Sequence, residues 1–104
     1  MTHPSKITFF DWLIPYVESG KKTITIRDET ESHYVPGTIV EVYVLETDRK
    51  VCNIEIVSVV PITFDEISAV HAEQEHMELP KLKQVIKDIY PDIDKLYVIS
   101  YKLV

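Results

Sequence analysis

The stretch TIVEVYVLETDRKVCNIEIVSVV, residues 38–60, decides the fold class. Residues 38–46 and 51–60 are rich in valine and isoleucine, whose branched side chains favour strands. The four residues TDRK between them form a short polar connection of the kind that joins antiparallel strands. The sequence therefore predicts a β-hairpin in the middle of the chain.

Two elements are predicted before this hairpin. Residues 7–20 place apolar side chains at helical spacing, with Pro15 inside and Gly20 at the end, which predicts a helix with an early 3₁₀ turn or a kink. TITIR, residues 23–27, alternates polar and apolar side chains, which predicts a strand. Residues 28–37 are polar and end in Pro-Gly, so we expect a loop there, with its acidic side chains in solvent.

Three further elements are predicted after the hairpin. Thr63 and Glu66 have the Thr-x-x-Glu spacing of a capping box, which predicts a helix over residues 63–75. Residues 78–90 carry apolar side chains on one helical face, which predicts a second helix. Residues 95–104 predict a terminal strand.

The order of these elements predicts an α+β fold in a single domain, residues 1–104. The first and last strands can pair and close a small β-barrel with flanking helices. Such closure would remove exposed strand edges. A split α/β sheet is the alternative.

Composition limits the classes of function. The net charge is −6, from 11 basic and 17 acidic residues, so we expect no DNA binding and disfavour RNA binding, which depends on lysine and arginine. Cys52 is the sole cysteine, which excludes an internal disulfide and a cysteine-based zinc site. No signal peptide or membrane-spanning apolar run is recognisable, so we expect a cytoplasmic monomer without a membrane partner.

The strand TITIR has one apolar and one polar face. Ile24 and Ile26 share the face that belongs in the core, whereas Thr23, Thr25 and Arg27 share the other. The polar face is either a stripe in solvent or the floor of a pocket lined by hydroxyls and a guanidinium.

Two lysines precede this strand. Lysines at the end of a helix commonly stabilise its dipole, which is one interpretation of Lys21 and Lys22. The other is catalytic: a partly buried lysine with a lowered pKa can remove the proton of a threonine hydroxyl such as that of Thr25.

HAEQEHM, residues 71–77, is a second polar cluster. His71 and Glu75 are four residues apart and share a face if the helix extends that far. The order differs from the zinc motif HExxH, because Ala72 stands where that motif has its glutamate, so we expect no metal. The cluster is either a solvated helix end or presents Glu75 to a pocket for proton transfer.

Five segments together resemble a known family. They are ITFF (7–10), GKKTITIRDETESH (20–33), HAEQEHM (71–77), IKDIYP (86–91) and YVIS (97–100). In order and in approximate spacing they resemble the small bacterial ASCH-domain N4-acetylcytidine amidohydrolases. Residues between 38 and 65 are the least similar part.

The resemblance implies a PUA-like ASCH domain and hydrolysis of the N4-acetyl amide of N4-acetylcytidine, without a metal or other cofactor. It implies Lys22 as proton acceptor, Thr25 as nucleophile and Glu75 as proton donor. The candidate substrate-binding residues are Lys21, Arg27 and His71. PUA-like domains often bind RNA, so an RNA-binding module without catalysis is the alternative.

Strand geometry raises one difficulty with these roles. Lys22 and Thr25 are three residues apart, so an ideal strand would point them to opposite faces, and Lys21 would share the face of Thr25. Either Lys22 precedes the regular strand and turns inward, or a bulge changes the phase.

Overall fold

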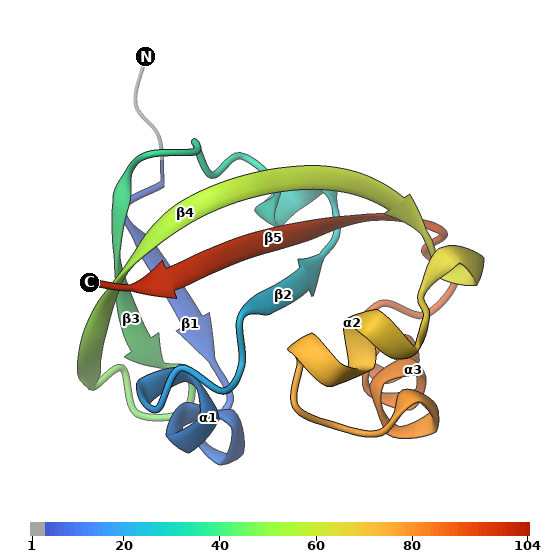
Figure 1. Ribbon diagram of the computed structural model, residues 1–104, viewed down its shortest axis with the longest axis horizontal. Helices are drawn as coiled ribbons and strands as arrows, with labels where there is room; N and C mark the ends of the chain where they lie inside the picture. Colours follow the sequence, from blue (N-terminus) through green and yellow to red (C-terminus); the bar gives the residue numbers. More distant parts are fainter. Residues whose placement is uncertain (1–3) are drawn as a thin grey trace.

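The computed structural model describes residues 4–104, so residues 1–3 of the predicted domain lie outside the described part. Its strands form one mixed sheet in the order β1-β3-β4-β5-β2; the first helix lies near the ends of β1 and β3, and the later helices lie together, apart from it (Figure 1). The strands are β1 (Lys6–Phe9), β2 (Ile24–Arg27), β3 (Ile39–Val44), β4 (Lys50–Thr63) and β5 (Lys95–Leu103). The helices are α1 (Ile14–Glu18), α2 (Ala69–Gln74) and α3 (Leu79–Ile89), with 3₁₀ turns η1 (Asp11–Leu13), η2 (Glu29–Glu31) and η3 (Phe64–Glu66). The predicted α+β class is confirmed, and within residues 4–104 no helix is both long and apolar enough to cross a membrane.

The hairpin of β3 and β4 lies at the centre of the sheet, and the other strands pair on either side of it. Strands β3 and β4 pair antiparallel, as predicted, and β4 continues to pair with β5. The predicted pairing of strand TITIR with the last strand is confirmed, because β2 pairs antiparallel with β5 and sets Thr25 opposite Ile99. In the ladder order of the described strands, β1 and β2 are the two edges of the sheet. A side chain bridges them: Arg27 Nη2 donates to the carbonyl oxygen of Thr8 at 2.7 Å.

The helix predicted over residues 7–20 is wrong in its first third. Residues 6–9 form β1, which pairs parallel with β3 from Lys6 opposite Glu41 onward. Its β-branched and aromatic side chains suit a strand, and pairing with β3 outweighs the helical spacing of the apolar residues. Pro15 lies in the first turn of α1, where it needs no hydrogen-bond partner for its nitrogen. Gly20, at φ +77°, ends the helix as predicted.

The single helix predicted over residues 63–75 is divided. The Thr63–Glu66 capping box is present, but it begins only the turn η3. Ile67 is extended and buried, so the chain leaves the helical path before Ser68 starts α2 with a capping box of its own. Helix α2 ends at Gln74, which leaves Glu75 at its C-terminal cap.

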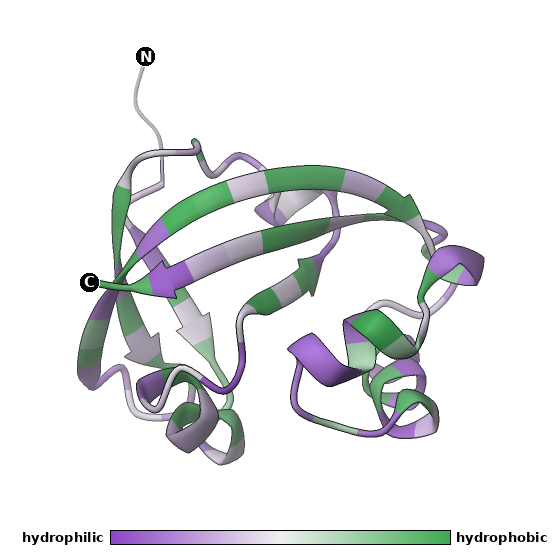
Figure 2. Ribbon diagram, viewed as in Figure 1, coloured by the Kyte–Doolittle hydropathy of each residue, from purple (hydrophilic) through white to green (hydrophobic). Residues whose placement is uncertain are grey.

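Two hydrophobic clusters hold the fold together. One joins residues of β1, β3, β4 and β5 to Val17 of α1. The other includes Ile24 and Ile26 of β2 and packs the sheet against α2 and α3. Met77 packs against both clusters. Figure 2 shows hydrophobic residues along β4 and β5, whereas the segment leading into β2 is hydrophilic.

Candidate active site

Three polar side chains are buried in the part of the chain that the structure describes. Lys22 is 2% exposed, Thr25 4% and Glu75 5%. They come from the segment before β2, from β2 itself and from the C-terminal cap of α2. Burying such groups costs free energy unless each is paired or hydrogen-bonded. All three line one cavity, so the structure brings together the three residues predicted to be catalytic.

This cavity lies between the edge strands β1 and β2 and is covered by α3. It encloses about 190 Å³. Its apolar wall is formed by Phe9, Phe10, Leu13, Ile26, Leu45, Met77, Leu82, Val85, Ile86 and Ile89. Its remaining lining residues are Thr8, Lys22, Thr25, Arg27, Glu31, Glu75 and Tyr90. An apolar pocket with a few convergent polar groups is the usual form of a small-molecule site.

Lys22 lies before the regular strand and turns inward, which removes the difficulty of strand phase. Its backbone N–H donates to Tyr16 O at 3.0 Å, outside the sheet ladder, and β2 begins two residues later. Its Nζ contacts the carboxylate of Glu75 and donates to Ile24 O at 2.7 Å. Burial, and then the positive charge of Arg27, lower the pKa of Lys22 well below its usual value. A lysine with a lowered pKa loses its proton more readily, and the neutral amine can act as a base.

The lowered pKa of Lys22 predicts a pH-dependent stability. Comparison of two variants isolates this effect. Glu75→Gln keeps the Lys22 amine buried near Arg27, whereas Lys22→Met/Glu75→Gln lacks the amine. Between the folded pKa of Lys22 and its ordinary value of 10.5 the unfolded chain binds more protons, so the folded state gains stability as pH rises. The free energy of unfolding of the single variant, minus that of the double, should therefore rise with pH and level off above 10.5. Urea titrations across the pH range measure it, and a constant difference would contradict a lowered pKa.

Thr25 is held by Arg27. Arg27 Nε donates to Thr25 Oγ1 at 2.8 Å, and Nη1 donates to Glu31 Oε1 at 2.7 Å. The Arg27 guanidinium lies 5.1 Å from the centre of the Phe9 ring, and Lys22 Nζ lies 5.6 Å from the same ring. The face of Phe9 therefore favours the positive charge of Arg27, and the amine of Lys22 lies near the same ring.

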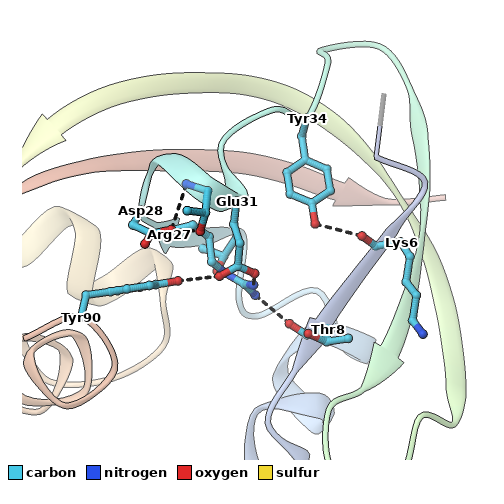
Figure 3. A network of polar contacts seen from close by, with 9 residues as sticks. Lys6, Thr8, Arg27, Asp28, Glu31, Tyr34 and Tyr90 are labelled. Atoms are coloured by element: carbon cyan, nitrogen blue, oxygen red, sulfur yellow. Dashed lines mark hydrogen bonds and ion pairs between the residues drawn. The ribbon is translucent and has the colours of Figure 1, made fainter. Parts of the chain in front are cut away.

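Glu31 and Tyr90 were not singled out by the sequence. The acidic residues after β2 were expected in a solvated loop; the side chain of Glu31 is 40% exposed, but both of its carboxylate oxygens also have protein partners. Its Oε1 accepts from Arg27, and its Oε2 accepts from the Tyr90 hydroxyl at 2.8 Å (Figure 3). The four-residue spacing of Arg27 and Glu31 was visible in the sequence, but the turn η2 that brings them together was not.

Two predicted substrate-binding residues lie away from the cavity lining. Lys21 is exposed. His71 accepts a hydrogen bond from the backbone N–H of Ser68 through Nδ1 at 3.0 Å and so caps α2. Their roles stay predictions. Arg27, the third predicted residue of this kind, lines the cavity. Within residues 4–104, no three His, Cys, Asp or Glu side chains gather as metal ligands would.

Comparison with known proteins places the chain in a family. The family model described as the ASCH domain matches residues 5–97, most of the chain. The chain belongs to the ASCH domain family. Curated relatives of similar sequence carry the name N(4)-acetylcytidine amidohydrolase, among them proteins from two Vibrio species. The one from Vibrio parahaemolyticus is 68% identical over 99% of this chain and 96% of its own length. The one from Vibrio campbellii is 65% identical over 99% of this chain and 97% of its own length.

The ASCH fold is also supported by a solved structure of low sequence identity. The crystal structure of an ASCH domain from Lactobacillus crispatus is 14% identical, with a TM-score of 0.76 over 97% of this chain and 80% of that chain. At this identity the similarity concerns the fold alone.

Proposed function

We propose that this protein is an N4-acetylcytidine amidohydrolase, which cleaves the N4-acetyl amide of N4-acetylcytidine and related N4-acylated cytosines to cytidine or cytosine and a carboxylate. The names of the two Vibrio relatives support the substrate. The observation that carries the proposal is the convergence of Lys22, Thr25 and Glu75, all buried, on one cavity. Burial of these groups without a function would only cost stability.

Acylation of Thr25 is the first step of the proposed reaction. Lys22 and Glu75 are in contact. In the proposed resting state the amine of Lys22 is neutral and the carboxyl of Glu75 carries the proton. Neutral Lys22 takes the proton of the Thr25 hydroxyl as Oγ1 attacks the acetyl carbonyl carbon. Lys22 Nζ donates to the Ile24 carbonyl, and the proposed step requires it to turn from there toward Thr25 within the cavity that both residues line.

Release of the two products returns Lys22 and Glu75 to their initial protonation states. Glu75 gives its proton to N4 as the C–N bond breaks, which yields cytidine and an acetyl ester on Thr25. A water molecule then attacks the ester carbonyl and loses a proton to the Glu75 carboxylate. Lys22 returns its proton to Thr25 Oγ1, and the carboxylic acid leaves. Both groups regain their initial protonation states, so no cofactor is required by this sequence.

Arg27 is the proposed electrostatic group of the reaction. Its Nε lies 2.8 Å from Thr25 Oγ1, so its positive charge is adjacent to the oxygen that attacks and to the carbonyl oxygen that becomes negative. The apolar wall of the cavity, including Phe9 and Phe10, would pack against the cytosine ring. Lys21 and His71 would contact only parts of a substrate that extend beyond the cavity.

The test is cytidine release from N4-acetylcytidine by the purified protein, followed by chromatography. We expect cytidine and acetate in equal amounts. Absence of release by the folded protein would contradict the proposal and favour the RNA-binding module. An RNA oligonucleotide carrying N4-acetylcytidine, assayed alongside the nucleoside, tells whether a polymer is accepted. The small volume of the cavity, about 190 Å³, favours the small molecule.

A further inference from the structure

Arg27 is the centre of the network around Thr25, and all three of its nitrogen atoms have protein partners. Nε donates to Thr25 Oγ1. Nη1 donates to Glu31 and Nη2 donates to the carbonyl oxygen of Thr8 (Figure 3). A guanidinium is planar and presents its donors in a rigid fork, so fixing two of them fixes the third. The direction in which Nε points therefore depends on where Glu31 and Thr8 hold the other two nitrogens.

Glu31 is itself fixed from two directions. It ends the turn η2, whose start is capped by Asp28: the Asp28 carboxylate accepts from the backbone N–H of Thr30 at 3.1 Å. From the other side, Tyr90 at the C-terminal cap of α3 donates its hydroxyl to Glu31 Oε2. One carboxylate thus joins the strand that carries the nucleophile to the helix that covers the cavity.

We propose that Glu31 is a positioning residue for the reaction of Thr25, that it acts through Arg27, and that Tyr90 holds it in place; the inference rests on the proposed function. With Glu31 in place, Arg27 Nε occupies one lone pair of Thr25 Oγ1. The hydroxyl proton must then point away from Arg27, which leaves it free to be donated into the cavity that Lys22 also lines. The same contact keeps a positive charge beside Oγ1 as it becomes an alkoxide-like nucleophile.

The Glu31→Ala variant is the principal test. It removes both carboxylate oxygens, so Arg27 is free to turn, and we expect kcat for N4-acetylcytidine to fall by about 10-fold or more, as misplacement of reacting groups does. KM should change little, because Glu31 is proposed to act on the nucleophile. Glu31→Gln retains an oxygen for Arg27 and an amide that can donate to the Tyr90 oxygen, so it should restore most of kcat. Glu29→Gln, exposed in the same turn, is the matched control.

Three results would overturn the inference. The first is a kcat of Glu31→Ala equal to that of Glu29→Gln. The second is a rise in KM at constant kcat, which would make Glu31 a substrate contact. The third is Glu31→Gln as impaired as Glu31→Ala, which would show that the charge matters and the position does not.

Tyr90→Phe tests the outer part of the network. The variant keeps the ring and removes the hydroxyl, so we expect a smaller loss of kcat than in Glu31→Ala. If Tyr90 acts through Glu31, Tyr90→Phe should have no further effect on kcat in the Glu31→Ala background. An additional loss of similar size in that background would contradict this part of the inference.

A measurement without turnover separates the inference from the proposed function. The Arg27 Nε–H group should give a distinct, slowly exchanging NMR signal in the wild-type protein, because its hydrogen bond to Thr25 is part-buried. The signal should exchange faster in Glu31→Ala and stay unchanged in Glu29→Gln. An unchanged signal in Glu31→Ala would overturn the inference. Absence of wild-type cytidine release would instead overturn the proposed function.

Discussion

Thr25→Ala is expected to abolish cytidine release, with kcat reduced by about 10³-fold or more, as happens when a covalent nucleophile is removed. The variant lacks the oxygen that attacks the acetyl carbon, and no other hydroxyl in the strand is placed to replace it. Thr23, two residues earlier, is exposed. Steady-state assays with N4-acetylcytidine measure the effect.

Two further variants and a stability measurement make this prediction specific. Thr25→Ser keeps the hydroxyl and should retain part of the turnover, whereas Thr23→Ala should leave turnover unchanged. Thr25→Ala also leaves Arg27 Nε without its acceptor, so its free energy of unfolding should fall by about 1–3 kcal/mol. Near-normal turnover by Thr25→Ala would contradict the covalent mechanism.

The second large effect concerns the buried pair of Lys22 and Glu75. Glu75→Gln preserves the shape of the side chain but removes the exchangeable proton, so kcat should fall by about 10²–10⁴-fold. Lys22→Met removes the base and leaves Glu75 buried without its partner. We therefore expect loss of turnover together with a fall of about 3–5 kcal/mol in the free energy of unfolding.

The variant Lys22→Met/Glu75→Gln separates catalysis from stability. It removes both titratable groups from the buried site, so it should be more stable than Lys22→Met while remaining inactive. Urea unfolding and cytidine release on the same preparations measure the two properties. If the double variant recovered turnover as well as stability, Lys22 and Glu75 would have no role in proton transfer and would serve only the stability of the fold.

The periodicity of apolar residues predicted an element correctly where the local pattern and the tertiary contacts favour the same secondary structure. The hairpin of β3 and β4 is rich in β-branched side chains, and α3 has one continuous apolar face, so both were predicted correctly. Strand β1 was missed because its apolar residues also fit helical spacing, and only its parallel pairing with β3 decides the matter. That pairing joins residues 6–9 to residues 41–44, a contact that local pattern cannot reveal.

The site residues show the same limit at the level of single side chains. Alternation along TITIR predicted the inward faces of Ile24 and Ile26 but favoured Lys21 over Lys22 as the partner of Thr25. The structure turns Lys22 inward because the chain enters β2 from a hydrogen bond to Tyr16 outside the sheet. The Lys22–Glu75 contact joins the segment before β2 to the C-terminal cap of α2, and local sequence pattern cannot reveal a contact between such distant residues.

The most direct test of the central claim is detection of an acetyl group on Thr25 during turnover. Protein mixed with excess N4-acetylcytidine is quenched in acid at short times, and intact mass and peptide mapping locate any adduct. The mechanism predicts a fraction of chains heavier by one acetyl group, with the group on the peptide containing Thr25 and absent from Thr25→Ala. Slow deacylation in Glu75→Gln should increase this fraction if some acylation persists. Cytidine release without any acetylated chain, in wild type or Glu75→Gln, would contradict a covalent role for Thr25 and indicate direct attack by water.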